Sequence, residues 1–189
     1  MRRCLILFLL LFTTACTRIP AGIEPVQSFD VERYLGKWYE IARLDHRFER
    51  GLSQVTAEYH PHEAGGIRVI NRGYSAAEDQ WEQAEGKAFF VGDKNTAHLK
   101  VSFFGPFYGS YIVFELDEQY QYAFVSGPSR DYLWLLARKP TVSDALKAHF
   151  INQAEQLGFA TRDLIFVEHD SGPNTHGFSS DREDNHAGN

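Results

Sequence analysis

The sequence predicts an all-β protein: an eight-stranded, antiparallel, up-and-down β-barrel with one C-terminal α-helix packed outside it. Short runs of β-branched and aromatic residues recur at even spacing between breaks that contain Gly, Pro or Asp. Fifteen Phe, nine Tyr and three Trp are an aromatic content typical of strands. The 189 residues can form one sizeable core but are too few for two comfortable domains.

The first fifteen residues have the layout of an export signal. Arg2 and Arg3 precede an unbroken apolar run over residues 5–12, and small residues follow directly before Cys16. This run is too short to span a bilayer, which needs about 20 residues. We therefore expect residues 1–15 to form a cleaved signal peptide of the lipoprotein type.

Cys16 would be the first residue of the mature chain, where it resembles the cysteine of the bacterial lipobox, whose thiol is acylated. Thr13 replaces the Leu that is usual three residues earlier, so a simple cleaved signal is the alternative. In lipoproteins a residue other than Asp after the cysteine, here Thr17, points to the outer membrane. Two or three acyl chains anchor a protein stably. We expect Cys16 to be lipidated, residues 16–28 to form a lipidated N-terminus and linker, and the domain to face the periplasm.

The remaining chain divides into one folded unit and a tail. Strand patterns are confined to residues 29–169, whereas residues 170–189 are rich in Gly, Ser, Asn, Asp and His and predict a disordered tail. Because Cys4 falls in the signal segment, no thiol is left in the domain to form a disulfide. The net charge of −6 provides no basic field for phosphates, so we expect no nucleic-acid partner.

Eight strand-like runs follow one another in the even spacing of an up-and-down barrel. They cover residues 38–44, 55–59, 67–74, 82–91, 97–103, 111–116, 122–126 and 132–138. The breaks contain turn-forming pairs such as Gly65-Gly66, Gly105-Pro106 and Gly127-Pro128. A barrel of eight strands is wide enough to hold one small ligand rather than a channel.

Alternate residues of the second and fourth runs indicate that the barrel is hollow. One face of each run is apolar and includes several small residues: Val55, Ala57 and Tyr59 in the second run, and Ala84, Gly86, Ala88 and Phe90 in the fourth. Such small side chains leave interior space, whereas a barrel filled by its own core would favour Leu and Ile at these positions. A merely well-packed core is the alternative reading of this pattern.

The periodicity changes once, after residue 140. Thr141 is a candidate N-cap with an acidic residue three positions later, as in a capping box. The apolar residues that follow lie on one helical stripe: Val142, Leu146, Phe150, Ala154 and Leu157. Gly158 suits the left-handed position after a helix, and Phe159 can fold back onto that helix. Residues 164–167 predict one further short strand.

Three short motifs resemble the signatures of the lipocalin family. Gly36-Lys37-Trp38 opens the first strand, Arg130-Asp131-Tyr132 precedes the last strand, and Arg138 ends it. The matching signature residues are Gly36, Trp38, Asp131, Tyr132 and Arg138. The resemblance implies that Arg138 closes the floor of the barrel by stacking on the Trp38 indole and bonding to nearby carbonyls. A planar guanidinium is suited to this arrangement.

Longer stretches resemble the bacterial outer-membrane lipoprotein lipocalins, kin to apolipoprotein D in the calycin superfamily. They cover residues 34–43, 46–51, 100–109 and 131–135. The lack of disulfides fits the bacterial members of the family. The resemblance implies reversible binding of fatty acids or lysophospholipids at the outer membrane. It also implies that two copies of the chain form a homodimer.

The ligand-binding candidates are apolar and aromatic residues that we expect to face the interior, any of which could instead pack without touching a ligand. They are Trp38, Ala42, Leu44, Val55, Tyr59, Val69, Phe90, Val101, Phe103, Tyr111, Val113, Phe124 and Trp134. An acyl chain needs only such an apolar sleeve, worth about 0.8 kcal/mol per methylene.

Two loop clusters could serve the polar end of a ligand or a partner. A basic cluster after the first strand could meet a phosphate or carboxylate, or be a solvated loop: Arg43, His46, Arg47 and Arg50. Phe104, Phe107 and Tyr108 are unusually apolar for a turn. They could form a partner surface or a membrane contact, or simply cap the barrel.

Catalysis finds little support in the sequence. A lipid hydrolase would need a nucleophile elbow, and Ser126-Gly127 lacks the Gly two residues before the serine. His60 and His62 are the only close pair of metal-ligand type, without an obvious third ligand, and phosphate-cradling motifs are absent. Glu40 is expected on the Trp38 face, where burial would raise its pKa and a structural hydrogen bond would be its role. We therefore expect no enzyme activity, metal or cofactor, and keep an envelope scaffold as the alternative to a lipid binder.

Overall fold

A computed structural model describes residues 17–170 of the chain. The expected signal peptide, the lipidation site Cys16 and the expected tail from residue 171 onwards lie outside the described residues. Among the helices within residues 17–170, none is long and apolar enough to cross a membrane.

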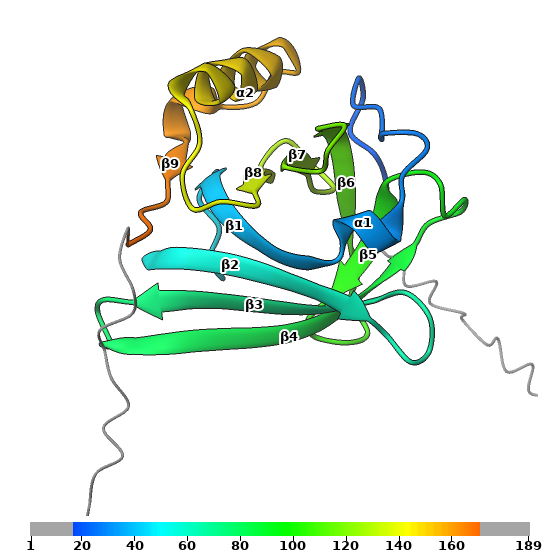
Figure 1. The fold of residues 1–189 in the computed structure, drawn as a ribbon, viewed down its shortest axis with the longest axis horizontal. Helices are drawn as coiled ribbons and strands as arrows, with labels where there is room; N and C mark the ends of the chain where they lie inside the picture. Colours follow the sequence, from blue (N-terminus) through cyan, green and yellow to red (C-terminus); the bar gives the residue numbers. More distant parts are fainter. Residues whose placement is uncertain (1–16, 171–189) are drawn as a thin grey trace, which may run out of the picture.

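Eight antiparallel strands form a closed barrel, as the sequence predicts (Figure 1). They are β1 (Gly36–Arg43), β2 (Leu52–Pro61), β3 (Ile67–Ser75), β4 (Gln80–Phe90), β5 (His98–Ser102), β6 (Gly109–Leu116), β7 (Tyr122–Ser126) and β8 (Leu133–Ala137). Neighbours in sequence pair in space, and β1 closes the ring by pairing with both β2 and β8. Closure satisfies the strand edges internally. The predicted ninth strand is β9 (Ile165–Phe166), which pairs with β1 outside the ring.

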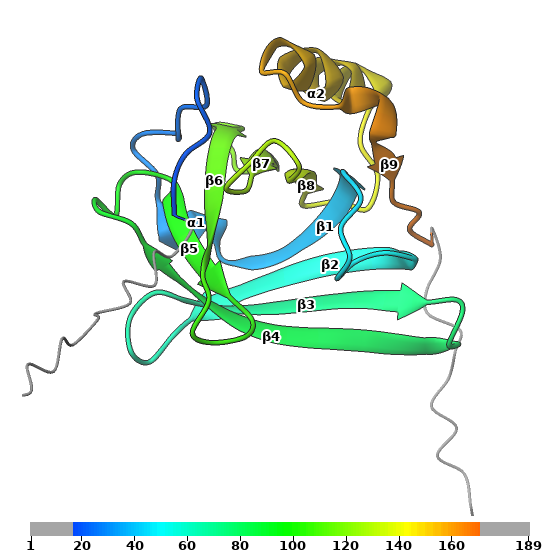
Figure 2. The same cartoon turned by 180° about the vertical axis from the view of Figure 1, so that it is seen from behind.

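The predicted helix is α2 (Asp144–Gln156), which covers one outer side of the barrel (Figures 1 and 2). Its N-cap is Ser143, whose Oγ accepts from the backbone N–H of Leu146 at 3.2 Å, so the prediction of Thr141 as the cap was wrong. Serine and threonine cap about equally well, and the later start places Asp144 in the first turn, where the helix dipole favours an acid. Gly158 ends the helix with φ +79°, and Phe159 folds back into the core as expected. A 3₁₀ turn, η1 (Thr161–Asp163), leads on to β9.

The structure contains a second, short helix that the sequence analysis did not predict. The helix α1 (Val31–Tyr34) lies across one end of the barrel, and its N-cap Asp30 accepts from the backbone N–H of Glu32 at 3.0 Å (Figure 1). Four residues are too few to show a helical period, so only the capping aspartate marks it in the sequence.

The segment expected to be a linker differs from the prediction in its described part, residues 17–28. It lies against the barrel instead of forming a spacer, because Val26 exchanges backbone hydrogen bonds of 2.9 Å with Val113 and Ala97. Ile23 is buried in the outer apolar layer, and the Arg18 carbonyl accepts from Ser110 Oγ at 2.9 Å.

The buried side chains form two apolar layers on opposite faces of the sheet. The inner layer fills the α1 end of the barrel and includes Trp38, Val113 and Leu136. The outer layer lies between β1, β6, β7, β8 and α2, and it includes Phe150 and Ala154 of the helix. Strands beneath the helix are therefore buried on both faces, which removes the apolar–polar alternation from their sequence.

Three predicted interior residues, Ala42, Leu44 and Phe124, belong to the outer layer, so their inward assignment was wrong. In β1 a bulge between Glu40 and Ala42 reverses the alternation, so that Ala42 pairs with the outer residue Leu135. Phe124 packs against Phe150 of α2, with ring centroids 4.9 Å apart.

Candidate ligand-binding site

The α1 end of the barrel is closed by a stacked Trp–Arg pair. The Arg138 guanidinium carbon lies 3.9 Å from the Trp38 ring centroid, as the resemblance implied. Its nitrogens donate to the carbonyls of Lys37, Arg33 and Tyr120 at 2.9, 2.8 and 3.2 Å. Trp38 Nε1 in turn donates to the Tyr34 carbonyl at 2.8 Å. These bonds tie α1, β1 and the turn between β6 and β7 to Arg138, so this end of the barrel has a floor.

A cavity of about 280 Å³ opens above this floor. Its walls are largely apolar and include Ala57, Val69, Ala88, Leu99 and Val101, as the small residues of β2 and β4 predicted. Small interior residues leave the space that larger ones would fill.

Three tyrosine hydroxyls meet at the bottom of the cavity. Tyr111 shares hydrogen bonds with Tyr34 at 2.7 Å and with Tyr59 at 2.9 Å. Burial raises the pKa of all three phenols, so they stay protonated and uncharged. Their polar groups satisfy one another, which leaves the ring faces to meet an apolar chain.

A second cavity of about 580 Å³ adjoins the first and opens toward the mouth of the barrel. The two share several lining residues, among them Phe48, Asn71 and Phe103. Phe104 and Phe107 line only the second cavity and are 78% and 75% exposed. Because the cavities are contiguous, a ligand can reach from the mouth to the tyrosines.

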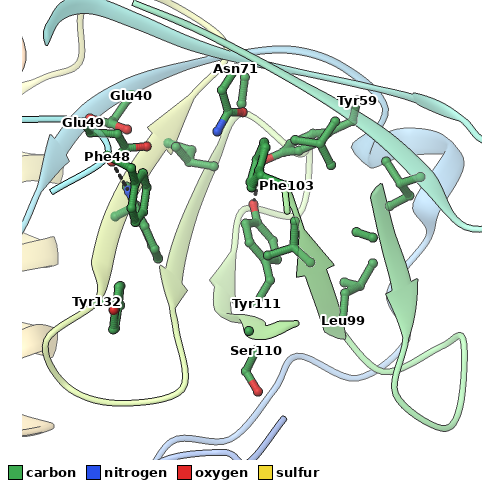
Figure 3. A pocket seen from close by; sticks show the side chains of 18 of the residues that line it. Glu40, Phe48, Glu49, Tyr59, Asn71, Leu99, Phe103, Ser110, Tyr111 and Tyr132 are labelled. Carbon is green, nitrogen blue, oxygen red and sulfur yellow. Dashed lines mark hydrogen bonds between the residues drawn. The ribbon is translucent and has the colours of Figure 1, made fainter. Parts of the chain in front are cut away.

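Charged side chains gather at one side of the mouth, at the boundary between the two cavities (Figure 3). Arg43 Nη1 donates to Glu40 Oε1 at 2.7 Å, and Arg43 Nη2 donates to the Glu49 carbonyl at 2.8 Å. Glu49 Oε2 accepts from Trp134 Nε1 at 3.1 Å. Glu40, Arg43 and Glu49, here called the mouth triad, are all buried, with exposures of 3%, 1% and 6%.

The mouth triad holds two carboxyls against one guanidinium. Burial and the neighbouring Glu49 raise the pKa of Glu40 well above its usual value, while Arg43 opposes the shift. Burial also raises the pKa of Glu49, against the Trp134 hydrogen bond and Arg43. A buried second negative charge is costly, so the two carboxyls resist being ionised together. The expectation that Glu40 faces inward with a raised pKa and bonds structurally is confirmed.

The predicted basic cluster does not form. Arg43 points into the mouth triad, Arg50 is paired with Asp45 at 2.6 Å outside the cavity, and Arg47 is exposed. His46 is buried in a stack with ring centroids 4.9 Å from Tyr132 and 4.8 Å from Trp134. Burial and the nearby Arg43 lower the pKa of His46 to about 4, so it is neutral at pH 7. Arg43 is missing from the cluster because the bulge after Glu40 turns its side chain inward.

Several polar atoms at the mouth are buried without a hydrogen-bond partner among residues 17–170. They are Arg43 Nε, His46 Nε2, Asn71 Oδ1 and, at the outer cavity, Ser102 Oγ. An unsatisfied buried polar atom costs about 1–3 kcal/mol. Asn71 lines both cavities and points into the space in Figure 3. A polar group of a ligand placed here would recover part of that free energy.

The thirteen predicted binding residues fall into three groups. Seven line the cavities: Tyr59, Val69, Val101, Phe103, Tyr111 and Trp134 in the inner one, and Val55 in the outer one. Three pack in the inner layer outside both linings, Trp38 and Val113 buried and Phe90 partly buried. The other three lie in the outer layer beneath α2, as described above.

Sequence reasoning missed Phe48, Glu49 and Asn71, which line both cavities. Phe48 and Glu49 sit in the loop between β1 and β2, where no strand period exists to orient them. Asn71 lies mid-strand on β3 and alternates with Ile67 and Val69 on one face, and a polar residue on that apolar face was a usable signal.

Metal-ligand residues are not grouped in the described part of the chain. Within residues 17–170, no three His, Cys, Asp or Glu side chains lie close enough to hold an ion. His60 Nε2 instead lies 3.5 Å from Glu58 Oε2, and His62 Nδ1 accepts from the backbone N–H of Ala64 at 3.1 Å.

A closed eight-stranded barrel with a stacked Trp–Arg floor and an apolar cavity defines a small-ligand-binding β-barrel. A model of the lipocalin-like domain matches residues 29–169. The chain is 54% identical over 169 residues to the outer membrane lipoprotein Blc of Vibrio cholerae, covering 89% of this chain and 99% of that protein. It is 38% identical over 125 residues to bovine apolipoprotein D, covering 61% of this chain and 65% of that protein.

The fold is also shared with solved structures of low sequence identity. Insecticyanin of the tobacco hornworm Manduca sexta superposes with a TM-score of 0.65 at 19% identity, over 81% of this chain and 87% of that chain. The chain belongs to the lipocalin family, as the three motifs indicated.

Proposed function

We propose that this protein binds one lipid amphiphile, a fatty acid or a lysophospholipid, with its acyl chain in the inner cavity and its polar end at the mouth triad. The single observation that carries the proposal is the division of one continuous space into an apolar inner part and a polar, incompletely bonded mouth. Each methylene that enters the apolar part contributes about 0.8 kcal/mol. The ten or more methylenes of a common acyl chain would therefore supply most of the affinity.

Between these two classes, the mouth triad favours a lysophospholipid. The raised pKa values of Glu40 and Glu49 indicate that this site disfavours further buried negative charge. The carboxylate of a fatty acid, which has no cationic group of its own, is therefore less suited to it than a head group with an ammonium beside its phosphate. A glycerol hydroxyl or an ammonium group can donate to these carboxyls and to Asn71 Oδ1. Aromatic rings beside the triad, Tyr132 and Trp134, also suit an ammonium.

We propose further that Cys16 carries lipid and anchors the domain to the outer membrane, facing the periplasm. The lipobox-like cysteine supports this location, as does the similarity to a protein named as an outer membrane lipoprotein. The role would be storage or transport of the amphiphile in the cell envelope rather than its chemical conversion. A homodimer is an additional proposal, which sedimentation of the purified lipoprotein would test.

Lipid extraction tests the binding function directly. The protein is purified from membranes in mild detergent and denatured, and the released lipids are identified by mass spectrometry. We expect lysophospholipid at close to one molecule per chain, and much less in an Ala57→Phe variant whose new ring occupies the cavity. No enriched lipid in either protein would contradict the proposal and favour an envelope scaffold. Lipid conversion by the wild-type protein, lost on changing one polar residue, would indicate an enzyme.

A further inference from the structure

An exposed group of aromatic side chains surrounds the mouth of the barrel. Phe48, Phe104 and Phe107, here called the aromatic rim, are 57%, 78% and 75% exposed and all line the outer cavity. Exposed phenylalanines gathered at one opening are unusual on a protein that meets only water. The rim is not needed to close the barrel, because the floor lies at the opposite end, where α1 and Arg138 pack.

The path of the N-terminal segment connects this rim to the expected lipid anchor. The Arg18 carbonyl accepts from Ser110 Oγ at 2.9 Å, and Ser110 is the second residue of β6, only three residues after Phe107. Cys16 precedes Arg18 by two residues, a length of chain that spans at most about 7 Å. The segment runs along the outside of β5 and β6 in both views (Figures 1 and 2). An acylated Cys16 therefore holds the β5–β6 side of the mouth at the membrane surface.

On the β5–β6 side of the rim, which the anchor holds nearest the membrane, the charges suit a bilayer that contains anionic lipids, whereas exposed Glu82 lines the outer cavity from β4. No Asp or Glu occurs between Asp93 and Glu115, although the chain contains 25 acidic residues. The Lys100 ammonium lies 5.1 Å from the centroid of the Tyr108 ring beside the rim, and Arg18 is exposed nearby. Basic side chains close to a surface are attracted to anionic headgroups, and tyrosine is favoured at the interface.

We propose that the aromatic rim inserts into the same leaflet that holds the Cys16 anchor, so that an amphiphile passes between leaflet and cavity without crossing water. This inference rests on the proposed anchoring function. Phenylalanine side chains that leave water for the acyl region each favour insertion by about tenfold or more. The anchor supplies proximity, and the rim sets which end of the barrel faces the lipid.

Single cysteines provide a direct test, because an acylated Cys16 does not react with thiol labels and Cys4 would be removed with the signal peptide. Phe104→Cys and Phe107→Cys variants of the full-length lipoprotein are labelled with a polarity-sensitive fluorophore. They are reconstituted into vesicles of phosphatidylethanolamine and phosphatidylglycerol, with and without acyl-brominated lipid. Phe166→Cys is the matched control, because Phe166 is a 43% exposed phenylalanine on β9, on another side of the barrel.

We expect bromolipid to quench the labels at positions 104 and 107 at least threefold more than the label at position 166, as contact with buried hydrocarbon requires. Equal quenching at all three positions would overturn the proposal. Protection of the rim labels without vesicles, rising with protein concentration, would show a second copy of the chain as the occupant and would also overturn it. A second label on Cys16 would show that the anchor is absent, which contradicts the proposed anchoring independently of the rim.

Transfer kinetics separate insertion from a simple role in shaping the cavity. In a Phe104→Ser/Phe107→Ser variant, transfer of fluorescent lysophosphatidylethanolamine from vesicles should slow by about tenfold or more, since two inserting rings are lost. Uptake of the same probe as a monomer from water can also fall, because both residues line the outer cavity, but we expect the ratio of vesicle transfer to monomer uptake to drop by about threefold or more. An equal fall in both rates would contradict insertion.

Discussion

Each end of the barrel places an arginine beside a tryptophan, but the two ends use the pair in opposite ways. At the floor, Arg138 stacks on Trp38 and each of its three side-chain nitrogens donates to a backbone carbonyl. At the mouth, Arg43 and Trp134 both bond to acidic residues, and Arg43 Nε is left without a partner among the described residues. The bonded end closes the barrel, whereas the mouth leaves Asn71 Oδ1, which faces both cavities, without a partner among the described residues.

The largest effect is expected from breaking the mouth triad. Arg43→Met removes the guanidinium that neutralises two buried carboxyls and should lower the free energy of unfolding by about 3–5 kcal/mol at pH 7. A double variant, Glu40→Leu/Arg43→Met, replaces the ion pair by apolar side chains and should recover most of that loss. Urea unfolding measures both. If the double variant lost as much stability as the Glu40→Leu and Arg43→Met variants added together, the pair would not be coupled.

The matching change at the floor should cost less. Arg138→Met removes one cation–π contact and three hydrogen bonds from a partly exposed side chain, so we expect a loss of about 2 kcal/mol. Affinity for lysophosphatidylethanolamine should stay within about twofold of wild type, because Arg138 lines neither cavity. A loss of affinity as large as that of a cavity-filling variant would mean that the two ends are not independent.

Acid should weaken the mouth through His46. The folded protein holds the pKa of His46 at about 4, below its unfolded value of about 6.5. Its neutral form therefore contributes stability above pH 6.5, which is lost as the pH falls from 6.5 toward 4. His46→Phe keeps a ring in the stack and should remove an acid destabilisation on the order of 2 kcal/mol. Urea unfolding at pH 7 and pH 4.5 checks this, and an unchanged difference between the two would contradict it.

A smaller effect, in which stability falls as the pH rises, is expected from Glu40 and its negative neighbour Glu49. The folded-state pKa of Glu40 is raised, so its favourable contribution is complete below its unfolded pKa of about 4.5 and is lost as the pH rises. Glu49→Gln removes the negative neighbour while its amide oxygen can still accept from Trp134. The loss of stability between pH 5 and 8 should shrink by about 1 kcal/mol. Glu82→Gln, an exposed change at the outer cavity, serves as the control and should leave this loss unchanged.

The two ends also differ in how far the sequence predicts them. The stacked pair at the floor was predicted through the resemblance of its two motifs to the lipocalin signatures, while helix α1 at the same end was not predicted. The strand order and the outer helix follow from periodicity and turn residues. These features depend on residues that are close in sequence or on regular alternation.

The mouth depends on exceptions to alternation. The bulge between Glu40 and Ala42 turned a predicted lining residue outward and a predicted surface arginine inward. On β7 the sequence Ala123-Phe124-Val125 is apolar on both faces because α2 covers the outer one, so the inward side could not be read. Glu49 reached the cavity from a loop, where no period applies.

The central claim is that the continuous cavity binds one amphiphile, and titration of the delipidated protein tests it most directly. In a Trp81→Phe background, the remaining tryptophans are Trp134 at the cavity and Trp38 at the floor. We predict a saturable change in tryptophan fluorescence with lysophosphatidylethanolamine at one ligand per chain. Ala57→Phe should weaken binding by about tenfold or more, because its ring fills the inner cavity. The claim would be contradicted if lysophosphatidylethanolamine left the fluorescence of the protein with Ala57 unchanged. It would also be contradicted if the Ala57→Phe variant bound this lipid with the same affinity.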